Sequence, residues 1–234
     1  MTELSESTPP GRELSESTPP GREFWESSFV DKQLMWGLEP SASARLACDA
    51  FARVGVENVL IPGVGYGRNV KPFLDKGMSV TGIEISETAI ALARTQLGLE
   101  IPIYQGSVAD MPYDSRHYEG IFCYGLIYLL AAEGREKLIR DCHRQLAPGG
   151  QMIFTLISKK APMYGLGTRI GEDWYERMPD LRLYFYDAES IEREFGSHGL
   201  VEIAEIDEPA HGGSLPFLHV VCKKPEAASP STTP

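Results

Sequence analysis

The stretch of sequence that decides the fold is Val59–Asn69, VLIPGVGYGRN. Its first four residues are apolar and predict a buried strand. Glycine then occupies alternate positions, which predicts a turn whose backbone passes very close to a ligand: Gly63, Gly65 and Gly67. The next apolar run, Met78–Ile85, carries Glu84 about 20 residues beyond the first glycine, where an acidic side chain can hold two ribose hydroxyls. The pattern therefore indicates a nucleotide-like cofactor.

The spacing of the glycines narrows the choice of cofactor. A dinucleotide fingerprint, G-x-G-x-x-G, that began at Gly63 would need glycine at position 68, and Arg68 stands there. In that fingerprint the third glycine allows the helix to pack closely on the strand beneath a pyrophosphate. The sequence therefore argues against a nicotinamide-dependent dehydrogenase.

Length and composition set the broad class of protein. The chain has 234 residues, 42% hydrophobic and 24% charged, which suits one globular α/β domain with an added segment. The net charge of −11 and the lack of a Lys/Arg block argue against a nucleic-acid partner. The four cysteines lie far apart, as free thiols of a reducing cytoplasm do. With no bilayer-length apolar run and no signal peptide, we expect a cytoplasmic protein without a membrane partner.

The two ends of the chain differ from its middle. A ten-residue unit, ELSESTPPGR, occurs at Glu3–Arg12 and again at Glu13–Arg22. Because this repeat is too poor in apolar residues to form a core, we expect residues 1–23 to be disordered, and likewise the tail 225–234. The folded domain is expected at residues 24–224, since a dense aromatic cluster begins at Phe24.

Apolar periodicity predicts alternating strands and helices along the domain. Helices are expected at Ala42–Val54, Asn69–Lys76, Ser86–Leu97, Ala132–Leu146 and Ala188–His198, with Ser41 and Ser86 as N-caps and Pro148-Gly149-Gly150 ending the fourth. Strands are expected at Asn58–Ile61, Ser79–Glu84, Ile101–Gln105, Tyr118–Cys123, Gln151–Leu156, Leu200–Asp207 and Phe217–Lys223. The alternation implies right-handed crossovers and a parallel sheet, whereas the last two strands, joined without a helix, should pair antiparallel.

Together these motifs resemble the class I S-adenosylmethionine-dependent methyltransferases over Phe51–Phe154. The glycine loop with Glu84 resembles motif I and the acidic loop of that family. Gln105–Pro112 looks like the segment that meets the adenine, Tyr118–Leu130 resembles the strand-four motif, and Arg144–Phe154 matches the L-x-PGG turn into strand five. The resemblance implies an α/β Rossmann-like fold with a seven-stranded, mostly parallel sheet, an antiparallel last strand and helices on both faces.

The resemblance also implies a cofactor and a set of binding residues. The cofactor would be S-adenosyl-L-methionine, with S-adenosyl-L-homocysteine as its product. Asp110 would accept a hydrogen bond from the adenine amino group and the Met111 backbone would meet the ring; the alternative is a turn in which Asp110 bonds only its own backbone. The full expected set is Gly63, Gly65, Gly67, Asn69, Glu84, Ile85, Asp110, Met111 and Tyr124.

The residues that would carry out methyl transfer are less clear from the sequence. Many relatives have Asn, Asp or His near the end of strand four, where this chain has Tyr124 and Tyr128. We expect both tyrosines to shape the methyl-transfer site, although a phenol with an ordinary pKa near 10 is not an obvious base. The general base stays unassigned. The histidines are scattered, so no metal site is expected.

Two further segments are candidates for substrate contact. Ser158–Asp187 is too long for a plain crossover loop and mixes cations with aromatic residues, which suits a lid over a small, anionic acceptor; the alternative is a surface excursion with its own small core. Residues 24–41 would be an N-terminal cover, since Trp36-Gly37-x-Glu39-Pro40-Ser41 is similar to tellurite- and thiopurine-type methyltransferases. The residues predicted to touch the substrate are Trp36, Tyr164 and Arg169.

The predicted function is transfer of a methyl group from S-adenosylmethionine to a small molecule by in-line displacement (EC 2.1.1 class). We expect a monomer or a homodimer. One alternative is a non-catalytic protein of the same fold that binds or senses the cofactor. Methylation of a macromolecule is a further alternative, which the absence of an appended RNA- or peptide-binding module disfavours.

Overall fold

A computed structural model describes residues 21–210 and 213–227 of the chain. The predictions of disorder for residues 1–20 and 228–234 lie outside these ranges. Helix α1 (Arg22–Lys32) begins slightly before the expected start of the domain at Phe24. No helix in the described ranges is both long and apolar enough to cross a membrane.

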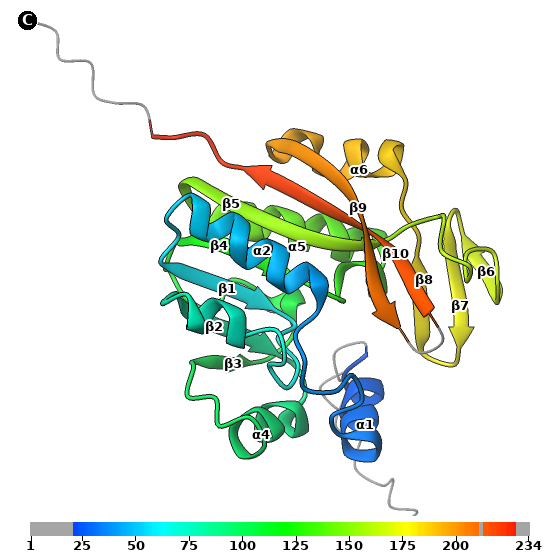
Figure 1. The fold of residues 1–234 in the computed structure, drawn as a ribbon. Coiled ribbons are helices and arrows are strands. Elements are labelled where there is room, and N and C mark those ends of the chain that lie inside the picture. The colour runs from blue at the N-terminus through cyan, green and yellow to red at the C-terminus, as the bar shows by residue number, and fades with distance from the viewer. Residues whose placement is uncertain (1–20, 211–212, 228–234) are drawn as a thin grey trace, which may run out of the picture.

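A seven-stranded sheet forms the centre of the domain (Figure 1), in the order β3-β2-β1-β4-β5-β10-β9. Its strands are β1 (Asn58–Pro62), β2 (Ser79–Glu84), β3 (Ile103–Gln105), β4 (Tyr118–Cys123), β5 (Leu146–Ile157), β9 (Leu200–Ala210) and β10 (Gly213–Lys223). Neighbouring strands from β3 to β5 run parallel, and β10 runs antiparallel to both β5 and β9. The predicted fold class, including the antiparallel terminal strand, is confirmed.

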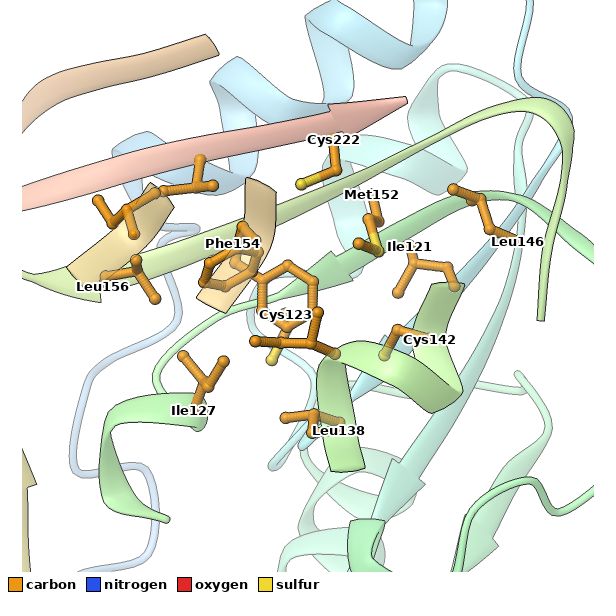
Figure 2. Packing of buried hydrophobic residues seen from close by; sticks show 14 of the residues in the cluster. Ile121, Cys123, Ile127, Leu138, Cys142, Leu146, Met152, Phe154, Leu156 and Cys222 are labelled. Carbon is orange, nitrogen blue, oxygen red and sulfur yellow. The ribbon is translucent and has the colours of Figure 1, made fainter. Parts of the chain in front are cut away.

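Helices cover both faces of this sheet. One face packs against α2 (Ala42–Arg53), α3 (Lys71–Asp75) and α4 (Glu87–Thr95), and the other against α5 (Ala132–Gln145) and α6 (Ala188–Phe195). Figure 2 shows the second of these cores, where Cys123 and Phe154 of the sheet meet Leu138 and Cys142 of α5. Short 3-10 turns occupy Val108–Asp110, Ile127–Leu129 and Gly196–His198.

The two predicted serine caps are confirmed. Ser41 Oγ accepts a hydrogen bond from Ala44 N at 3.1 Å, and Ser86 Oγ accepts one from Ala89 N at 3.0 Å. Helix α3 is shorter than predicted and leaves Asn69 in the preceding loop. Pro72 stands at the start of this helix, where its missing N–H costs no hydrogen bond.

The helix predicted at Ala132–Leu146 ends one residue early, before Pro148-Gly149-Gly150. Helix α5 ends at Gln145 and β5 begins at once at Leu146, so all three residues lie within the strand. Lys224 provides the physical reason, since its Nζ donates to the carbonyl oxygens of His143 at 3.0 Å and Leu146 at 2.7 Å. A lysine therefore satisfies the end of the helix, where a glycine was expected to do so.

The segment Ser158–Asp187 contains three strands that the sequence did not predict. They are β6 (Thr168–Gly171), β7 (Trp174–Met178) and β8 (Leu181–Tyr184), which form an antiparallel sheet of their own. Asp173 and Asp180 adopt positive φ at the two turns between them. This small sheet lies beside β9 and β10 in Figure 1 and shares an apolar cluster with Ile157 and Phe217 of the main sheet. The segment thus packs through a small apolar cluster that it shares with the main sheet.

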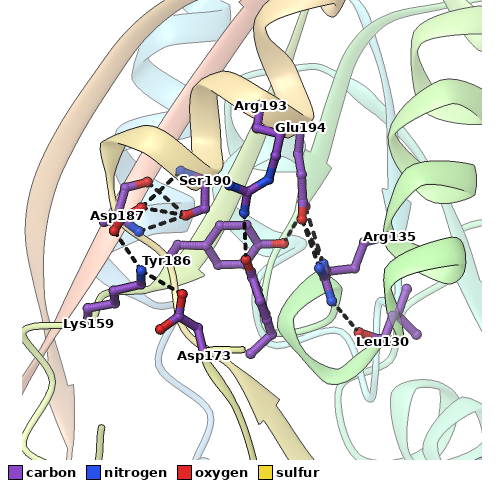
Figure 3. A network of polar contacts seen from close by, with 10 residues as sticks. Leu130, Arg135, Lys159, Asp173, Tyr186, Asp187, Ser190, Arg193 and Glu194 are labelled. Atoms are coloured by element: carbon purple, nitrogen blue, oxygen red, sulfur yellow. Dashed lines mark hydrogen bonds and ion pairs between the residues drawn. The ribbon is translucent and has the colours of Figure 1, made fainter. Parts of the chain in front are cut away.

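A polar network fixes this segment to α5 and α6 (Figure 3). Arg135 of α5 forms a buried ion pair with Glu194 of α6 at 2.8 Å, and Tyr186 Oη donates to the same carboxylate at 2.9 Å. Lys159 pairs with Asp173 and with Asp187, each at 2.6 Å. Because these partners come from distant parts of the chain, the network holds the start and the end of the segment in place.

We expect Arg135→Met to lower the free energy of unfolding by about 3 kcal/mol or more, because Glu194 would be left as a buried, unpaired charge. The side chain of Arg135 is 6% exposed. Arg140, on the same helix, is the matched control: it is 49% exposed and pairs with Glu136, so Arg140→Met should cost less than about 1 kcal/mol. Urea denaturation measures both values. Equal losses would contradict the importance of the buried pair.

Candidate active site

The loops that follow the parallel strands meet at one edge of the sheet, the edge where open α/β sheets bind ligands. In the loop after β1, the three glycines all have positive φ: 68° at Gly63, 57° at Gly65 and 84° at Gly67. Their surroundings differ. A Cβ on Gly67 would lie 2.3 Å from Leu99 Cδ1, whereas one on Gly65 would meet nothing closer than Phe29 Cζ at 3.8 Å. Positive φ thus favours glycine at all three positions, while the space for a side chain is tight at Gly67 and free at Gly65.

Glu84, at the end of β2, joins this loop to the next. Its carboxylate accepts hydrogen bonds from Gly65 N at 2.8 Å and from Ile85 N and Ser86 N at 2.9 Å each, and the residue is buried. Burial raises the pKa of Glu84 above its ordinary value, and the three amide donors act in the opposite direction. Because a carboxylate offers about four acceptor positions, it can still accept from a ligand hydroxyl.

The segment expected to meet the adenine follows β3. Asp110 is exposed at the end of the 3-10 turn, and its carboxylate accepts no hydrogen bond from any residue in the described ranges. The alternative of an Asx turn is thus absent, since Ser107 caps the turn by accepting from Ala109 N at 3.1 Å. Met111 is buried with its carbonyl bonded to Lys137, while Ile85 is half-buried beside Glu84.

Three side chains of the glycine loop bind the N-terminal segment. Asn69 Oδ1 accepts from Ser41 N at 2.9 Å. Tyr66 Oη donates to Gly37 O at 2.8 Å, and Arg68 Nη1 donates to Trp36 O at 3.0 Å. Asn69 is predicted to contact the cofactor, and its amide oxygen also holds the start of α2. The role of Tyr66 was not predicted from the sequence, and Arg68 was identified only as a departure from a glycine pattern.

Helix α1 lies over the same loop and beside α4 (Figure 1). Glu26 accepts hydrogen bonds from Ser86 Oγ at 2.6 Å and Thr88 N at 3.3 Å, at the first turn of α4. Phe29 packs edge-to-face on Tyr66 with ring centroids 6.1 Å apart, and Trp36 stacks on Tyr66 at 6.0 Å. The N-terminal residues thus cover the loop that carries Gly65.

Tyr124 and Tyr128 lie beyond the end of β4, and both contact the ring of Phe217 on β10. Tyr124 stacks on Phe217 with centroids 6.4 Å apart, and Tyr128 meets the same ring edge-on at 6.0 Å. Tyr124 Oη accepts from Arg68 Nη2 at 3.2 Å. Burial raises the pKa of Tyr124 to about 12 and raises that of Tyr128 further, so both are neutral phenols near pH 7. Neither is poised to act as a base.

The three residues predicted to touch the substrate do not form one group. Trp36 lies on Tyr66, with 46% of its surface exposed. Tyr164 donates to Asp173 at 2.6 Å, and Arg169 donates to Gly171 O within the small sheet. The cations expected to attract an anion are largely paired: Lys159 with Asp173 and Asp187, Lys160 with Glu205, and Arg182 with Glu176. Arg169 and Arg177 of the same segment donate only to backbone carbonyls, so the anionic acceptor stays a prediction.

A further acidic residue at this edge was not predicted. Glu208 of β9 is 3% exposed, and its carboxylate accepts from Ser43 N at 2.7 Å and Ala42 N at 3.1 Å, the first two amides of α2. Its strand, LVEIAEIDEPA, carries several acidic residues, and Glu202 and Glu205 are exposed. The alternation of apolar and polar residues along the strand therefore could not identify Glu208 as the buried acidic residue.

The sheet order and the glycine loop with its buried acidic partner define the class I fold of S-adenosylmethionine-dependent methyltransferases. Residues 59–150 match the family model described as a methyltransferase domain. The chain is 28% identical over 120 residues to the ubiquinone biosynthesis O-methyltransferase of Pseudomonas syringae pathovar tomato, covering 50% of this chain and 51% of that protein. It is 27% identical over 158 residues to the demethylmenaquinone methyltransferase of Tropheryma whipplei, covering 63% and 64%.

Solved structures share the fold across most of the chain. The 1,6-didemethyltoxoflavin-N1-methyltransferase of Burkholderia thailandensis, solved with its substrate and S-adenosylhomocysteine, has a TM-score of 0.70 at 19% identity and covers 94% of both chains. The glycopeptide N-methyltransferase MtfA with S-adenosylmethionine has a TM-score of 0.58 at 21% identity, covering 78% of this chain and 94% of that one. The chain spans about half the length of the first curated relatives it matches: 51% of the first and 50% of the second.

We expect Glu26→Gln to loosen α1 from the site, because it removes the charge that strengthens the hydrogen bonds from Ser86 and Thr88. Amide hydrogen exchange over residues 22–32 should rise about tenfold, which corresponds to the loss of a charge-assisted hydrogen bond. Glu23→Gln, at an exposed position of the same helix, should change it little.

The same contact predicts a pH dependence. Burial opposes ionisation, but the hydrogen bonds from Ser86 and Thr88 prevail and lower the pKa of Glu26 below 4.5. A lowered carboxyl pKa stabilises the docked helix above the unfolded value and loses that stabilisation as the pH falls through the folded value. The protection of the α1 amides, corrected for their intrinsic exchange rate at each pH, should therefore fall below about pH 4.5 in the natural protein. If Glu26→Gln lacks this acid-dependent change in exchange, the contact of Glu26 with α4 is its cause. If Glu26→Gln shows the same change, the contact is not its cause.

Proposed function

We propose that this protein transfers a methyl group from S-adenosylmethionine to a small molecule. The observation that carries the proposal is the buried Glu84 carboxylate, which holds Gly65 N at 2.8 Å and keeps acceptor capacity for ribose hydroxyls. Asp110 is exposed with an unused carboxylate on the next loop, as an adenine partner should be. The family match over residues 59–150 and the solved neighbours that contain this cofactor or its product support the same cofactor here.

The residues present fit the chemistry of such a reaction. When bound, S-adenosylmethionine supplies a methyl group on a positively charged sulfur that is already activated for displacement. We assign to Gly63, Gly65 and Glu84 the binding of the amino-acid and ribose portions, and to Ile85, Asp110 and Met111 that of the adenine. Tyr124 and Tyr128 then shape the space in which the acceptor is aligned, and alignment is the main contribution an in-line transfer needs.

A small, partly apolar acceptor suits the surroundings. Tyr124, Tyr128 and Phe217 form an aromatic wall beyond the carboxyl end of β4 and beside the last residue of β5, with which Phe217 of β10 is paired. Two of the curated relatives act in quinone biosynthesis by their names, which is compatible with an acceptor of this size. The finer link to tellurite- and thiopurine-type enzymes rests on Trp36–Ser41 alone, so we rank it second.

Two further proposals concern the state of the protein. We propose a cytoplasmic location, supported by four cysteines that are all buried as free thiols. A monomer or a homodimer stays the expected assembly. Sedimentation of the purified full chain distinguishes a monomer from a homodimer directly.

We expect Glu84→Ala to weaken the binding of S-adenosylhomocysteine about tenfold or more, because it removes charge-assisted hydrogen bonds to the ribose. Isothermal calorimetry on the purified chain measures this affinity. Glu100→Ala, at an exposed position outside the site, is the control and should bind as the natural protein does. Unchanged affinity in Glu84→Ala would show that the ribose site lies elsewhere.

A screen with S-adenosylmethionine labelled in its methyl group tests turnover. Incubation with thiols, amines, phenols and metalloid oxyanions should transfer label to at least one class of acceptor. Binding of S-adenosylhomocysteine without transfer to any acceptor would favour the alternative, a non-catalytic protein that binds or senses the cofactor. Binding of NAD in its place would reject both.

A further inference from the structure

A cavity of about 260 Å³ lies between the segment that precedes β4 and the end of α5. Its polar lining comes from both sides and includes Asp114, Arg116, Asp141, Arg144 and Gln145. The two lining segments lead directly into strands that begin at Tyr118 and Leu146, and these two residues are paired. The cavity therefore lies at the amino ends of two parallel strands, at the edge opposite the one where the cofactor is expected.

One buried acceptor in this lining has no partner. Gln145 is 7% exposed, and its Nε2 donates to Asp114 O at 3.3 Å and to Asp114 Oδ1 at 3.1 Å. These two contacts fix the orientation of the amide, because a reversed amide would place its oxygen against two acceptors. Gln145 Oε1 is buried and accepts no hydrogen bond from any residue in the described ranges. Since an unpaired buried acceptor is costly, a ligand with an N–H donor would relieve that cost by binding here.

Asp141 adds a buried carboxylate to the same lining. Its side chain is 3% exposed; one oxygen pairs with Lys137 and the other lies 3.4 Å from Arg144 Nη1. The contact with Arg144 is long, and the side chain of Arg144 is 64% exposed, so the guanidinium can move at little cost. A carboxylate offers about four acceptor positions, so Asp141 can also accept from a ligand. The buried part of the lining thus presents acceptors.

The exposed part of the lining presents cations. Arg116 is 53% exposed, and its Nε donates to Asp114 Oδ2 at 2.9 Å. Burial opposes the ionisation of Asp114, but hydrogen bonds from Tyr118 and Arg116, among others, prevail and lower its pKa. Asp114 is therefore a charged group with its own partners. A guanidinium has five N–H donors, so Arg116 and Arg144 both keep donors for an anionic group of a ligand.

We propose that this cavity binds a small zwitterion of the amino-acid class. Gln145 Oε1 and the Asp141 carboxylate would accept from its ammonium group, and the guanidiniums of Arg116 and Arg144 would donate to its carboxylate. A ligand with a single charge would use only the acceptors or only the guanidiniums. The volume is below that of a pocket for a drug-sized molecule, which suits a ligand of this size. The site is additional to the proposed methyl transfer and does not depend on it.

The test uses L-alanine and the two molecules that each lack one of its charged groups, propionate and ethylamine. Each is titrated at pH 7 into the isotope-labelled full chain, without and with saturating S-adenosylhomocysteine. NMR follows the side-chain amide of Gln145, whose signal is assigned by its loss in Gln145→Met. We expect L-alanine to shift this signal and to bind about tenfold more tightly than either analogue, because each analogue lacks a charge-assisted contact. Its affinity should be the same in both conditions, since the cofactor is expected at the opposite edge.

Arg144→Met should reduce the advantage of L-alanine over ethylamine and leave the affinity for ethylamine unchanged, because only the carboxylate loses a partner. Arg140→Met is the matched control: Arg140 lies one turn earlier on α5, is 49% exposed, pairs with Glu136 and does not line the cavity. It should preserve the ranking of the probes.

Four results would overturn the proposal: equal affinity for the three probes, no shift of the Gln145 signal, an Arg144→Met protein that keeps the full advantage of L-alanine, or displacement of L-alanine by S-adenosylhomocysteine. The last result would place the probe in the cofactor site. Failure to bind S-adenosylhomocysteine would instead reject the proposed function alone, because the titrations without it still test the cavity.

Discussion

The hydrogen bonds to the Glu84 carboxylate are the constraint on which the rest of the site depends. Three backbone amides from two loops converge on one buried anion: Gly65 N after β1, and Ile85 N and Ser86 N after β2. This contact fixes the conformation of the glycine loop relative to the next strand before any ligand binds. Its cost is visible in the raised pKa of Glu84, because burial disfavours the charged form. A fold that needed only a turn here could use a neutral acceptor.

The second layer of the site is built on this loop. Tyr66, Arg68 and Asn69 direct their polar atoms outward to the segment Trp36–Ser41, while Glu26 of α1 holds the start of α4. The N-terminal residues and the glycine loop therefore form one hydrogen-bonded unit. Arg68 extends this unit to the acceptor side, since it donates to both Trp36 O and Tyr124 Oη. Arg68 in this way connects the glycine loop to the residues around the methyl-transfer position.

Much of the fold could be predicted from the sequence, because it depends on local signals. The boundaries of β2 and β4 and the caps Ser41 and Ser86 followed from apolar runs and from side chains that bond nearby amides. The misses depend on contacts between distant residues. Lys224 satisfies the end of α5 from 78 residues or more away. The strands β6 to β8 carry charged residues whose ion pairs are invisible to periodicity, and Glu208 looks like its exposed neighbours on β9.

The distribution of charge at the site edge follows from these long-range contacts. Glu84 and Glu208 are both buried there and form no ion pair in the described part of the chain, whereas Lys159, Lys160 and Arg182 of the β6–β8 segment are bound to carboxylates. Three of the basic residues that suggested an anionic acceptor are thus used in ion pairs, whereas Arg169 and Arg177 donate only to backbone carbonyls. Arg68 adds a guanidinium beside Tyr124, so the edge carries buried carboxylates and a cation together. The positive charge on sulfur before transfer is complementary to the carboxylates of this edge.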